Sequence, residues 1–215
     1  MESGIEKFVF KHPSTCYVSG PTGCGKTSYI IKVLMEKDNL FDKSIDKIVW
    51  CYKIYQDIFE EVKEICSNIE FHEGICDVRD IKHGKENIIL IIDDLMNDMN
   101  KEVAEIFTVH SHHMGISVFF LAQNLYPRNK FMRDVTLNTQ YLILFEQRRD
   151  LSQLHVLTRQ IFPYNGRTFL KVYKEMTKQK YGYMLIDMNP SNVYRFLLRT
   201  NIFQDEYEII YAPTE

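Results

Sequence analysis

The stretch that decides the fold is Gly20-Pro21-Thr22-Gly23-Cys24-Gly25-Lys26-Thr27. It matches the pattern G-x-x-x-x-G-K-[ST], and it lies between a β-type run at 15–18 and an amphipathic stretch at 26–37. The glycines let the backbone turn closely enough for its amide N–H groups to point at phosphate oxygens, and the following helix adds the positive end of its dipole. The sequence therefore predicts a loop that binds the phosphates of ATP, with every residue from Gly20 through Ser28 contacting the nucleotide.

Four side chains, two in this loop and two after a later strand, carry the first part of the expected chemistry. Lys26 offers an ammonium group to the β- and γ-phosphates, and Thr27 offers a hydroxyl to Mg²⁺. Asp93 and Asp94 follow the apolar run 88–92, which is typical of a strand covered on both faces. Because a carboxylate at the carboxyl end of such a strand lies at the ligand crevice, we expect Asp93 to hold Mg²⁺ opposite Thr27. Asp94 is then placed to orient and polarise the attacking water.

A third strand supplies an amide. The run 117–122 ends in Gln123 and Asn124. If this strand lies between the phosphate-loop strand and the Asp93 strand, Gln123 reaches the γ-phosphate and the attacking water. A neutral amide in that place can sense the product without a change of charge.

Strands and helices alternate along most of the chain. Strands are expected at 15–18, 47–52, 88–92, 117–122 and 140–145, and helices at 26–37, 55–66, 101–112 and 151–160. Such alternation implies an α/β fold with a parallel sheet and right-handed crossovers. After a helix at 167–177, strands at 181–186 and 193–198 are expected to add to the sheet edge in the antiparallel sense. The segments 77–87 and 126–134 are the most loop-like.

Length and composition fit one intracellular domain. With 215 residues, 45% hydrophobic and 26% charged, the chain is typical of a single globular unit, with a core at about 12–165 and edge strands with an acidic tail at about 166–215. Its longest apolar run has five residues, whereas a membrane span needs ~20. Five cysteines without a Cys-x-x-Cys pattern argue against a disulfide framework. The segment 128–180 carries eleven basic and four acidic residues, which suits a polyanion.

The ordered set of phosphate loop, Asp93-Asp94 and the strand 114–124 ending in Gln123 resembles the FtsK–HerA superfamily of DNA-pumping ATPases. The segments 137–139, 145–150 and 181–187 narrow the resemblance to the genome-packaging ATPases of poxvirus-type large DNA viruses and Polinton-like viruses. This resemblance covers residues 12 to 203. It implies a RecA-like, ASCE-type P-loop NTPase with strand order 5-1-4-3-2, and it implies the same roles for the residues named above.

The resemblance also implies partners. A homo-oligomeric ring, pentamer or hexamer, would move double-stranded DNA into a capsid, with capsid vertex proteins as further partners. The work would take place in a virus factory in the host nucleus or cytoplasm, or on the virion. The sequence departs from much of the superfamily at Asp94, where Glu is common, so the carboxylate is one methylene shorter and the strand tip must lie closer or a water must relay the contact.

An arginine from a neighbouring subunit commonly completes the site in ring ATPases, because a cation at the γ-phosphate offsets the developing charge. Arg149 is the candidate, since it follows the strand 140–145 at a tip that can face a neighbour. Arg148, Arg128 and Arg133 are rivals. Two other functions share the phosphate loop: a nucleoside or nucleotide kinase-type phosphotransferase, and a nucleotide-gated structural binder. Asp94 argues against both, and Gln123 also argues against the kinase.

Overall fold

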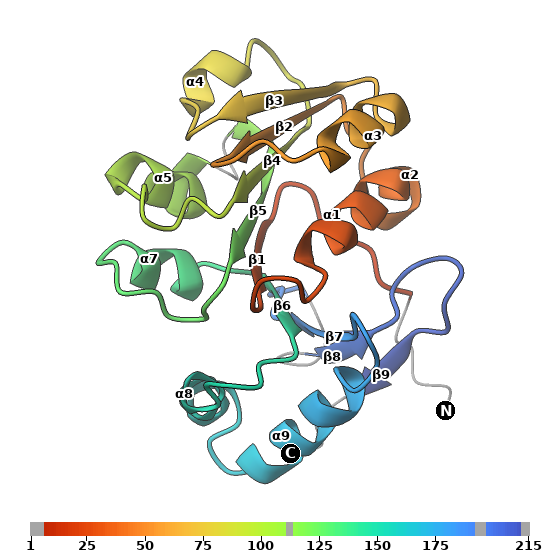
Figure 1. Ribbon diagram of the computed structural model, residues 1–215, viewed down its shortest axis with the longest axis vertical. Coiled ribbons are helices and arrows are strands. Elements are labelled where there is room, and N and C mark those ends of the chain that lie inside the picture. The colour runs from red at the N-terminus through yellow and green to blue at the C-terminus, as the bar shows by residue number, and fades with distance from the viewer. Residues whose placement is uncertain (1–6, 111–113, 192–196, 212–215) are drawn as a thin grey trace.

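The computed structural model describes residues 7–110, 114–191 and 197–211, which form one mixed sheet with helices on both of its faces (Figure 1). The order of the strands is β3-β2-β4-β5-β1-β6-β7-β8-β9. Pairing is parallel from β3 to β6 and antiparallel from β6 to β9. No helix in the described ranges is long and apolar enough to cross a lipid bilayer.

The elements have the following bounds. The strands are β1 (Thr15–Ser19), β2 (Lys47–Tyr52), β3 (Ile69–Glu73), β4 (Ile88–Asp93), β5 (Ile116–Ala122), β6 (Tyr141–Phe145), β7 (Tyr183–Asp187), β8 (Leu197–Thr200) and β9 (Ile209–Tyr211). The helices are α1 (Lys26–Met35), α2 (Lys37–Leu40), α3 (Ile58–Ile65), α4 (Val78–Ile81), α5 (Lys101–Glu105), the π-helical η1 (Ile106–His110), α7 (Met132–Leu137), α8 (Ser152–Ile161) and α9 (Gly166–Met176).

The expected α/β class is confirmed, and the strand order differs in one detail. Strands β6, β1, β5, β4 and β2 lie side by side in the order 5-1-4-3-2, and β3 adds a further parallel strand beyond β2. Strand β3 was not predicted from the sequence. Its residues Ile-Glu-Phe-His-Glu are exposed or half-buried, because it lies at the edge of the sheet, and so they lack the apolar run that marks the central strands.

Successive side chains of each central strand point to opposite faces and enter two separate cores. In β4, Ile88, Leu90 and Ile92 pack in one core, whereas Ile89 and Ile91 pack in the other. The first core lies under α4, α5, α7, α8 and α9, and the second lies under α1, α2 and α3 (Figure 1). A strand buried on both faces needs apolar residues at every position, which explains the continuous run at 88–92.

Several boundaries differ from the expected ones. The stretch 26–37 is broken between α1 and α2, and the stretch 55–66 is helical only from Ile58. The loop-like segments contain the short α4 and the start of α7. The expected helix at 101–112 is α5 continued by η1, and its last two positions lie outside the described residues.

The expected antiparallel strands at the sheet edge are present. Residues of β7 pair with β6, and β8 and β9 follow, while positions 193–196 of the expected last strand lie outside the described ranges. A buried ion-pair cluster ties these three strands together. Arg199 in β8 lies 3.7 Å (Nε) from Asp187 Oδ2 in β7, and its Nη1 donates to Glu208 Oε1 just before β9. The side chains of Arg199 and Asp187 are each 6% exposed, so little water screens them.

Replacing the buried cation should therefore cost much stability. We expect Arg199→Met to lower the free energy of unfolding by about 3 kcal/mol at pH 7, because two carboxylates are left buried without their cation. Urea denaturation checks this, with Arg148→Met as the control. Arg148 also pairs with a carboxylate, Glu146, but its side chain is 83% exposed, so its loss should cost less than about 1 kcal/mol. Equal costs for the two variants would contradict the assignment of Arg199 as the tie between these strands.

Candidate active site

The carboxyl ends of β1, β4 and β5 meet at one place on the sheet. β5 lies between β1 and β4, as the Gln123 hypothesis requires. Ser19 pairs with Ala122, and Asp93 pairs with Leu121. The Gly20 amide donates a hydrogen bond of 3.1 Å to the carbonyl of Ala122. The phosphate loop, the acid pair and Gln123 therefore leave the sheet side by side.

The loop from Gly20 to Gly25 takes a backbone path that needs its glycines. Gly23 and Gly25 have φ angles of 78° and 108°, in the region that favours glycine. At Gly20, a Cβ would lie 2.6 Å from Cys24 Sγ and 2.7 Å from Phe145 Cβ. A side chain at either Gly20 or Gly25 would force the loop to move. The tight path brings the backbone close enough to wrap around a phosphate group.

Lys26 opens α1 and folds back over this loop. Its ammonium donates to the carbonyl oxygens of Gly20 at 2.6 Å and Pro21 at 3.1 Å. The first turn of α1 has no acidic residue and no side-chain cap, so its free amides and the ammonium face the same side. This arrangement concentrates positive potential where the sequence analysis placed the phosphates.

Asp93 is the buried acid of the site. Burial raises the pKa of its carboxyl to about 6, and the adjacent charge of Asp94 raises it further, while the Trp50 side chain and the charge of Lys26 oppose the rise. Its Oδ2 atom is buried and accepts no hydrogen bond from the described residues. A buried carboxylate oxygen without a donor suits a hard cation, and the Thr27 hydroxyl belongs to the same cavity. The chemistry of Asp93 and Thr27 thus fits Mg²⁺, and their binding of the ion stays a prediction.

Asp94 and Gln123 contact each other across two strand ends. The Gln123 amide Nε2 donates a hydrogen bond of 3.0 Å to Asp94 Oδ1. Asp94 has a φ angle of 54°, a conformation that costs free energy for a residue other than glycine. The carboxylate is exposed. The pair is therefore a solvent-facing carboxylate held in place by an amide, which is the arrangement expected for a group that orients water.

One cavity of about 380 Å³ brings the expected residues together. Lys26, Thr27, Asp93, Asp94 and Gln123 all line it. The rest of its wall consists of Thr22, Gly23, Gly25, Ser28, Gln56, Leu121 and Tyr181. Of the nucleotide-binding residues expected from the sequence, Gly20, Pro21 and Cys24 do not line this cavity; Pro21 and Cys24 line the neighbouring one.

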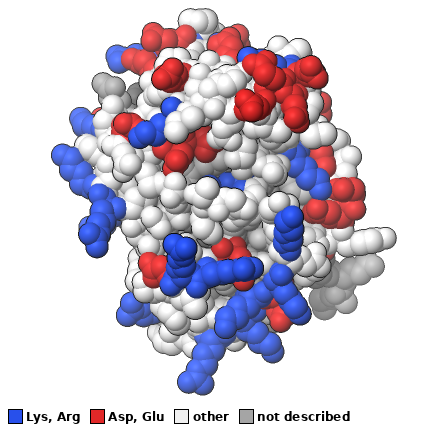
Figure 2. Space-filling model, in the orientation of Figure 1, with Lys and Arg blue, Asp and Glu red and all other residues white. Residues whose placement is uncertain are grey.

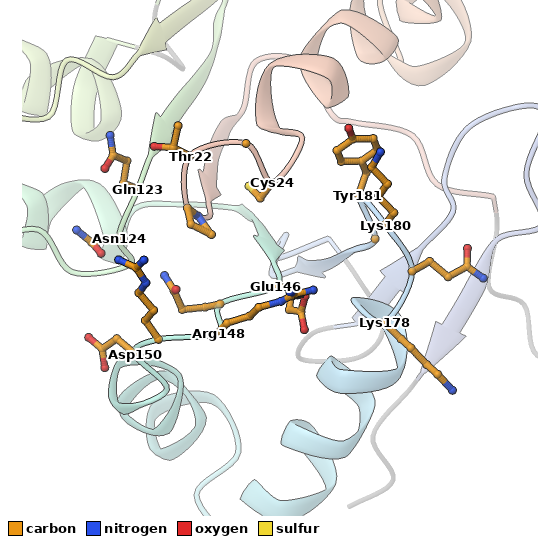
Figure 3. Close-up of a pocket in the computed structure, with 16 residues that line it drawn as sticks. Thr22, Cys24, Gln123, Asn124, Glu146, Arg148, Asp150, Lys178, Lys180 and Tyr181 are labelled. Atoms are coloured by element: carbon orange, nitrogen blue, oxygen red, sulfur yellow. Dashed lines mark hydrogen bonds and ion pairs between the residues drawn. The ribbon is translucent and has the colours of Figure 1, made fainter.

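The neighbouring cavity, of about 790 Å³, lies between the phosphate loop and the segments that follow β6 and α9 (Figure 3). Arg149 lines it together with residues 21–24 of its own chain. Arg148 also lines this cavity, and its Nε donates a hydrogen bond of 2.8 Å to Glu146 Oε2. Arg133 instead lines a separate cavity of about 540 Å³, and Arg128 is exposed. Among the four candidates, the structure thus brings Arg148 and Arg149 to the phosphate loop, and the action of Arg149 on a neighbouring subunit stays a prediction.

Sequence reasoning missed Gln56 and Tyr181 as residues of the site. Tyr181 lines both cavities, and a Cβ on Gly25 would lie 2.9 Å from its ring. From the sequence, Tyr181 was expected to begin the strand 181–186, but the strand begins at Tyr183 and leaves Tyr181 in the turn before it. No local pattern could have placed it here, because the contact depends on how the antiparallel strands fold back onto the sheet.

Fold and site together define the class: the chain has a RecA-like P-loop NTPase fold, with its phosphate loop, acid pair and amide in the expected places. Among solved structures, the chain is similar to the genome packaging NTPase B204 from Sulfolobus turreted icosahedral virus 2, solved in complex with ATP-gammaS. The TM-score is 0.56 at 14% sequence identity, over 94% of this chain and 98% of that one. At this identity the likeness establishes the fold, and it agrees with the resemblance to viral packaging ATPases drawn from the motifs.

Other structural matches are more distant. The cytoplasmic domain of EssC matches with a TM-score of 0.49 at 14% identity, over 94% of this chain and 40% of that one. The flagellar accessory protein FlaH from Methanocaldococcus jannaschii matches with a TM-score of 0.45 at 8% identity, over 95% and 91%. No family model and no curated protein matches the sequence.

The raised pKa of Asp93 predicts how the metal-free protein responds to pH. Between about pH 4 and pH 6 the folded state holds a proton that the unfolded chain releases, so this carboxyl makes the protein less stable as the pH rises through that window. Asp93→Asn removes the buried charge. We expect the variant to be more stable than wild type at pH 7.5, by up to about 3 kcal/mol, and to lose this advantage near pH 4.5.

Thermal or urea unfolding at the two pH values measures the effect. Asp98→Asn is the control, because that carboxylate is exposed and is not among the groups that shift the pKa of Asp93, and its effect should be small at both pH values. A stability gain for Asp93→Asn that does not change with pH would contradict the assignment of Asp93 as a buried acid with a raised pKa.

Proposed function

We propose that the protein is an Mg-ATP-hydrolysing motor that moves double-stranded DNA, in the packaging of a viral genome. The observation that carries the hydrolytic part is the hydrogen bond of 3.0 Å between Gln123 and Asp94, in the cavity that also contains Lys26 and Asp93. A simple phosphotransferase needs no second acid beside the metal-binding one. An enzyme that attacks the γ-phosphate with water needs a carboxylate there to accept its proton.

Each residue then has a distinct task. The loop amides and Lys26 bind the β- and γ-phosphates and offset their charge. Asp93 and Thr27 would hold Mg²⁺, which neutralises charge on the β- and γ-phosphate oxygens when bound. Asp94 accepts the proton of the attacking water, and Gln123 fixes the Asp94 carboxylate through the bond of 3.0 Å. We expect the same amide to reach the γ-phosphate, so that hydrolysis would change its hydrogen bonding at the end of β5.

The basic surface of α9 supports a polyanion as the partner. Arg167, Lys171, Lys174 and Lys178 recur at spacings of four, three and four residues, so they follow one side of α9 and the turn after it. All four are exposed, and within the described residues none of them forms an ion pair. Lys and Arg side chains gather over the part of the molecule where α8 and α9 lie (Figures 1 and 2). Such a row of free cations suits the phosphates of DNA and carries no sequence preference.

The remaining parts of the proposal concern assembly. A homo-oligomeric ring, pentamer or hexamer, would enclose the DNA, and Arg149 of one subunit would act at the nucleotide of the next. Capsid vertex proteins would be further partners, in a virus factory of the infected cell or on the virion. The likeness to a viral genome packaging NTPase, over nearly the full length of both chains, supports this reading.

The motor hypothesis predicts an ATPase that responds to DNA. We expect long double-stranded DNA to stimulate ATP hydrolysis, and Lys26→Ala and Asp94→Asn each to lower the rate by ~100-fold or more, because they remove phosphate binding and the base. Phosphate release with and without DNA measures this. Asp98→Asn is the control, since Asp98 is a nearby acid that pairs with Lys53 outside the cavity. A rate that DNA does not change at any salt concentration would rule out the motor, and transfer of phosphate to a nucleoside would favour the kinase.

The α9 surface predicts a specific salt dependence. We expect Lys171→Ala with Lys174→Ala to weaken DNA binding and to reduce the slope of log affinity against log salt by about 2, since each lost phosphate contact removes ~0.9 from the slope. Lys43→Ala with Lys85→Ala is the matched control. Those two exposed lysines precede β2 and β4, at the opposite ends of the strands from the site. Fluorescence anisotropy with a duplex across salt concentrations distinguishes them, and equal slopes for the two double variants would exclude α9 as the DNA contact.

A further inference from the structure

Tyr181 occupies a place in the structure that packing alone does not explain. Its ring contacts the phosphate loop at Gly25, where a Cβ would lie 2.9 Å from Cδ1 and 3.2 Å from Cγ. Its φ angle is 64°, which is costly for an aromatic residue. Yet the residue is 53% exposed, and it lines both the cavity of Lys26 and the larger cavity beside it. Tyr181 thus has an unfavourable backbone conformation although about half of the residue is exposed to solvent.

The turn between α9 and β7 holds this ring in place. Gly182 donates a hydrogen bond of 2.8 Å to the carbonyl of Gln179. A Cβ on Gly182 would lie 2.9 Å from the carbonyl oxygens of both Gln179 and Met176, so the turn closes tightly. On its other side Tyr183 is buried and accepts a hydrogen bond of 3.0 Å from the Ile202 amide. Because both flanks are fixed, the fold sets the backbone position of Tyr181 beside the phosphate loop.

The neighbouring tyrosines show how this protein treats aromatic rings that serve only its structure. Tyr173 is buried, and its hydroxyl donates to Phe145 O and accepts from Gln147 N, each at 2.8 Å. Tyr183 is buried in the same way. Tyr181 instead lines both cavities, and the ammonium of the adjacent Lys180 lies 4.8 Å from the centre of its ring (Figure 3). An exposed aromatic face next to a phosphate loop, with a cation close by, suits a flat π-system joined to phosphates.

We propose that Tyr181 is the stacking platform for the nucleobase of the nucleotide whose phosphates the loop binds. This inference rests on the proposed function and names a subsite of the same site. Thr27, Ser28 and Tyr181 line one cavity. When the phosphates are bound at the first turn of α1, the attached nucleoside would therefore lie beside the Tyr181 ring. Every nucleobase has a π-face, and purines offer the larger one, so the platform gives affinity for purine nucleotides with weak discrimination between adenine and guanine.

The test separates the base from the phosphates. Calorimetry compares the binding of two ligands with Mg²⁺, a non-hydrolysable ATP analogue and inorganic tripolyphosphate, which has no base. We expect Tyr181→Ala to lower the affinity for the ATP analogue by ~5- to 100-fold and to change the affinity for tripolyphosphate by no more than about twofold. Tyr181→Phe keeps the aromatic face and should bind both ligands like wild type. Tyr164→Ala is the matched control, because Tyr164 is 96% exposed and lies outside both cavities.

The possible outcomes distinguish this inference from the proposed function. If Tyr181→Ala weakens both ligands equally, the ring only supports the loop, and the base platform is wrong while the nucleotide site stands. An unchanged affinity of Tyr181→Ala for the ATP analogue also overturns the platform alone. If wild type binds neither ligand, or if Lys26→Ala binds both as well as wild type does, the nucleotide site itself fails and the platform fails with it.

Discussion

The parallel pairing of β5 between β1 and β4 is the constraint on which the site depends. It sets Ser19 beside Ala122 and Asp93 beside Leu121, so three segments that are far apart in the sequence leave the sheet at one edge. The chemical groups of the site are then the residues at the carboxyl ends of these three strands. The phosphate loop continues from β1, the acid pair closes β4, and Gln123 continues from β5. A shift of one residue in either pairing would point the terminal side chains to the opposite faces of the sheet.

Electrostatics at this edge are balanced between opposed groups. The ammonium of Lys26 and the amides at the start of α1 supply positive potential, and Asp93 is buried beside them. Burial disfavours the charge on Asp93, whereas Lys26 favours it. Burial therefore leaves the charged form of this carboxyl less stable than it is in water, and the ammonium of Lys26 offsets part of that loss. Asp94, one residue later, is exposed and accepts a hydrogen bond from the Gln123 amide.

The antiparallel strands determine which residues lie beside the same edge of the sheet. β7 pairs with β6, and the buried cluster of Asp187, Arg199 and Glu208 ties β7 to β8 and to the start of β9. Through this addition the turn 178–182 is brought against the phosphate loop, where Gly25 leaves room for the Tyr181 ring. The C-terminal part of the chain therefore lines the same cavities as the phosphate loop near the N-terminus.

The sequence by itself determined the elements that carry local signals. The phosphate loop has a fixed spacing of glycines before Lys26, and the runs 88–92 and 117–122 are apolar because both faces of those strands are covered, so the loop, Asp93, Asp94 and Gln123 could be placed at strand ends from pattern alone. Only the tertiary structure decided what depends on contacts between distant segments. The edge strand β3 lacks an apolar run, because half of its surroundings is solvent. Strand pairing and the turns between strands decide two further features. They bring Tyr181 into contact with Gly25, and they place Arg148 and Arg149, but not Arg133, beside the phosphate loop. No local sequence pattern indicates either feature.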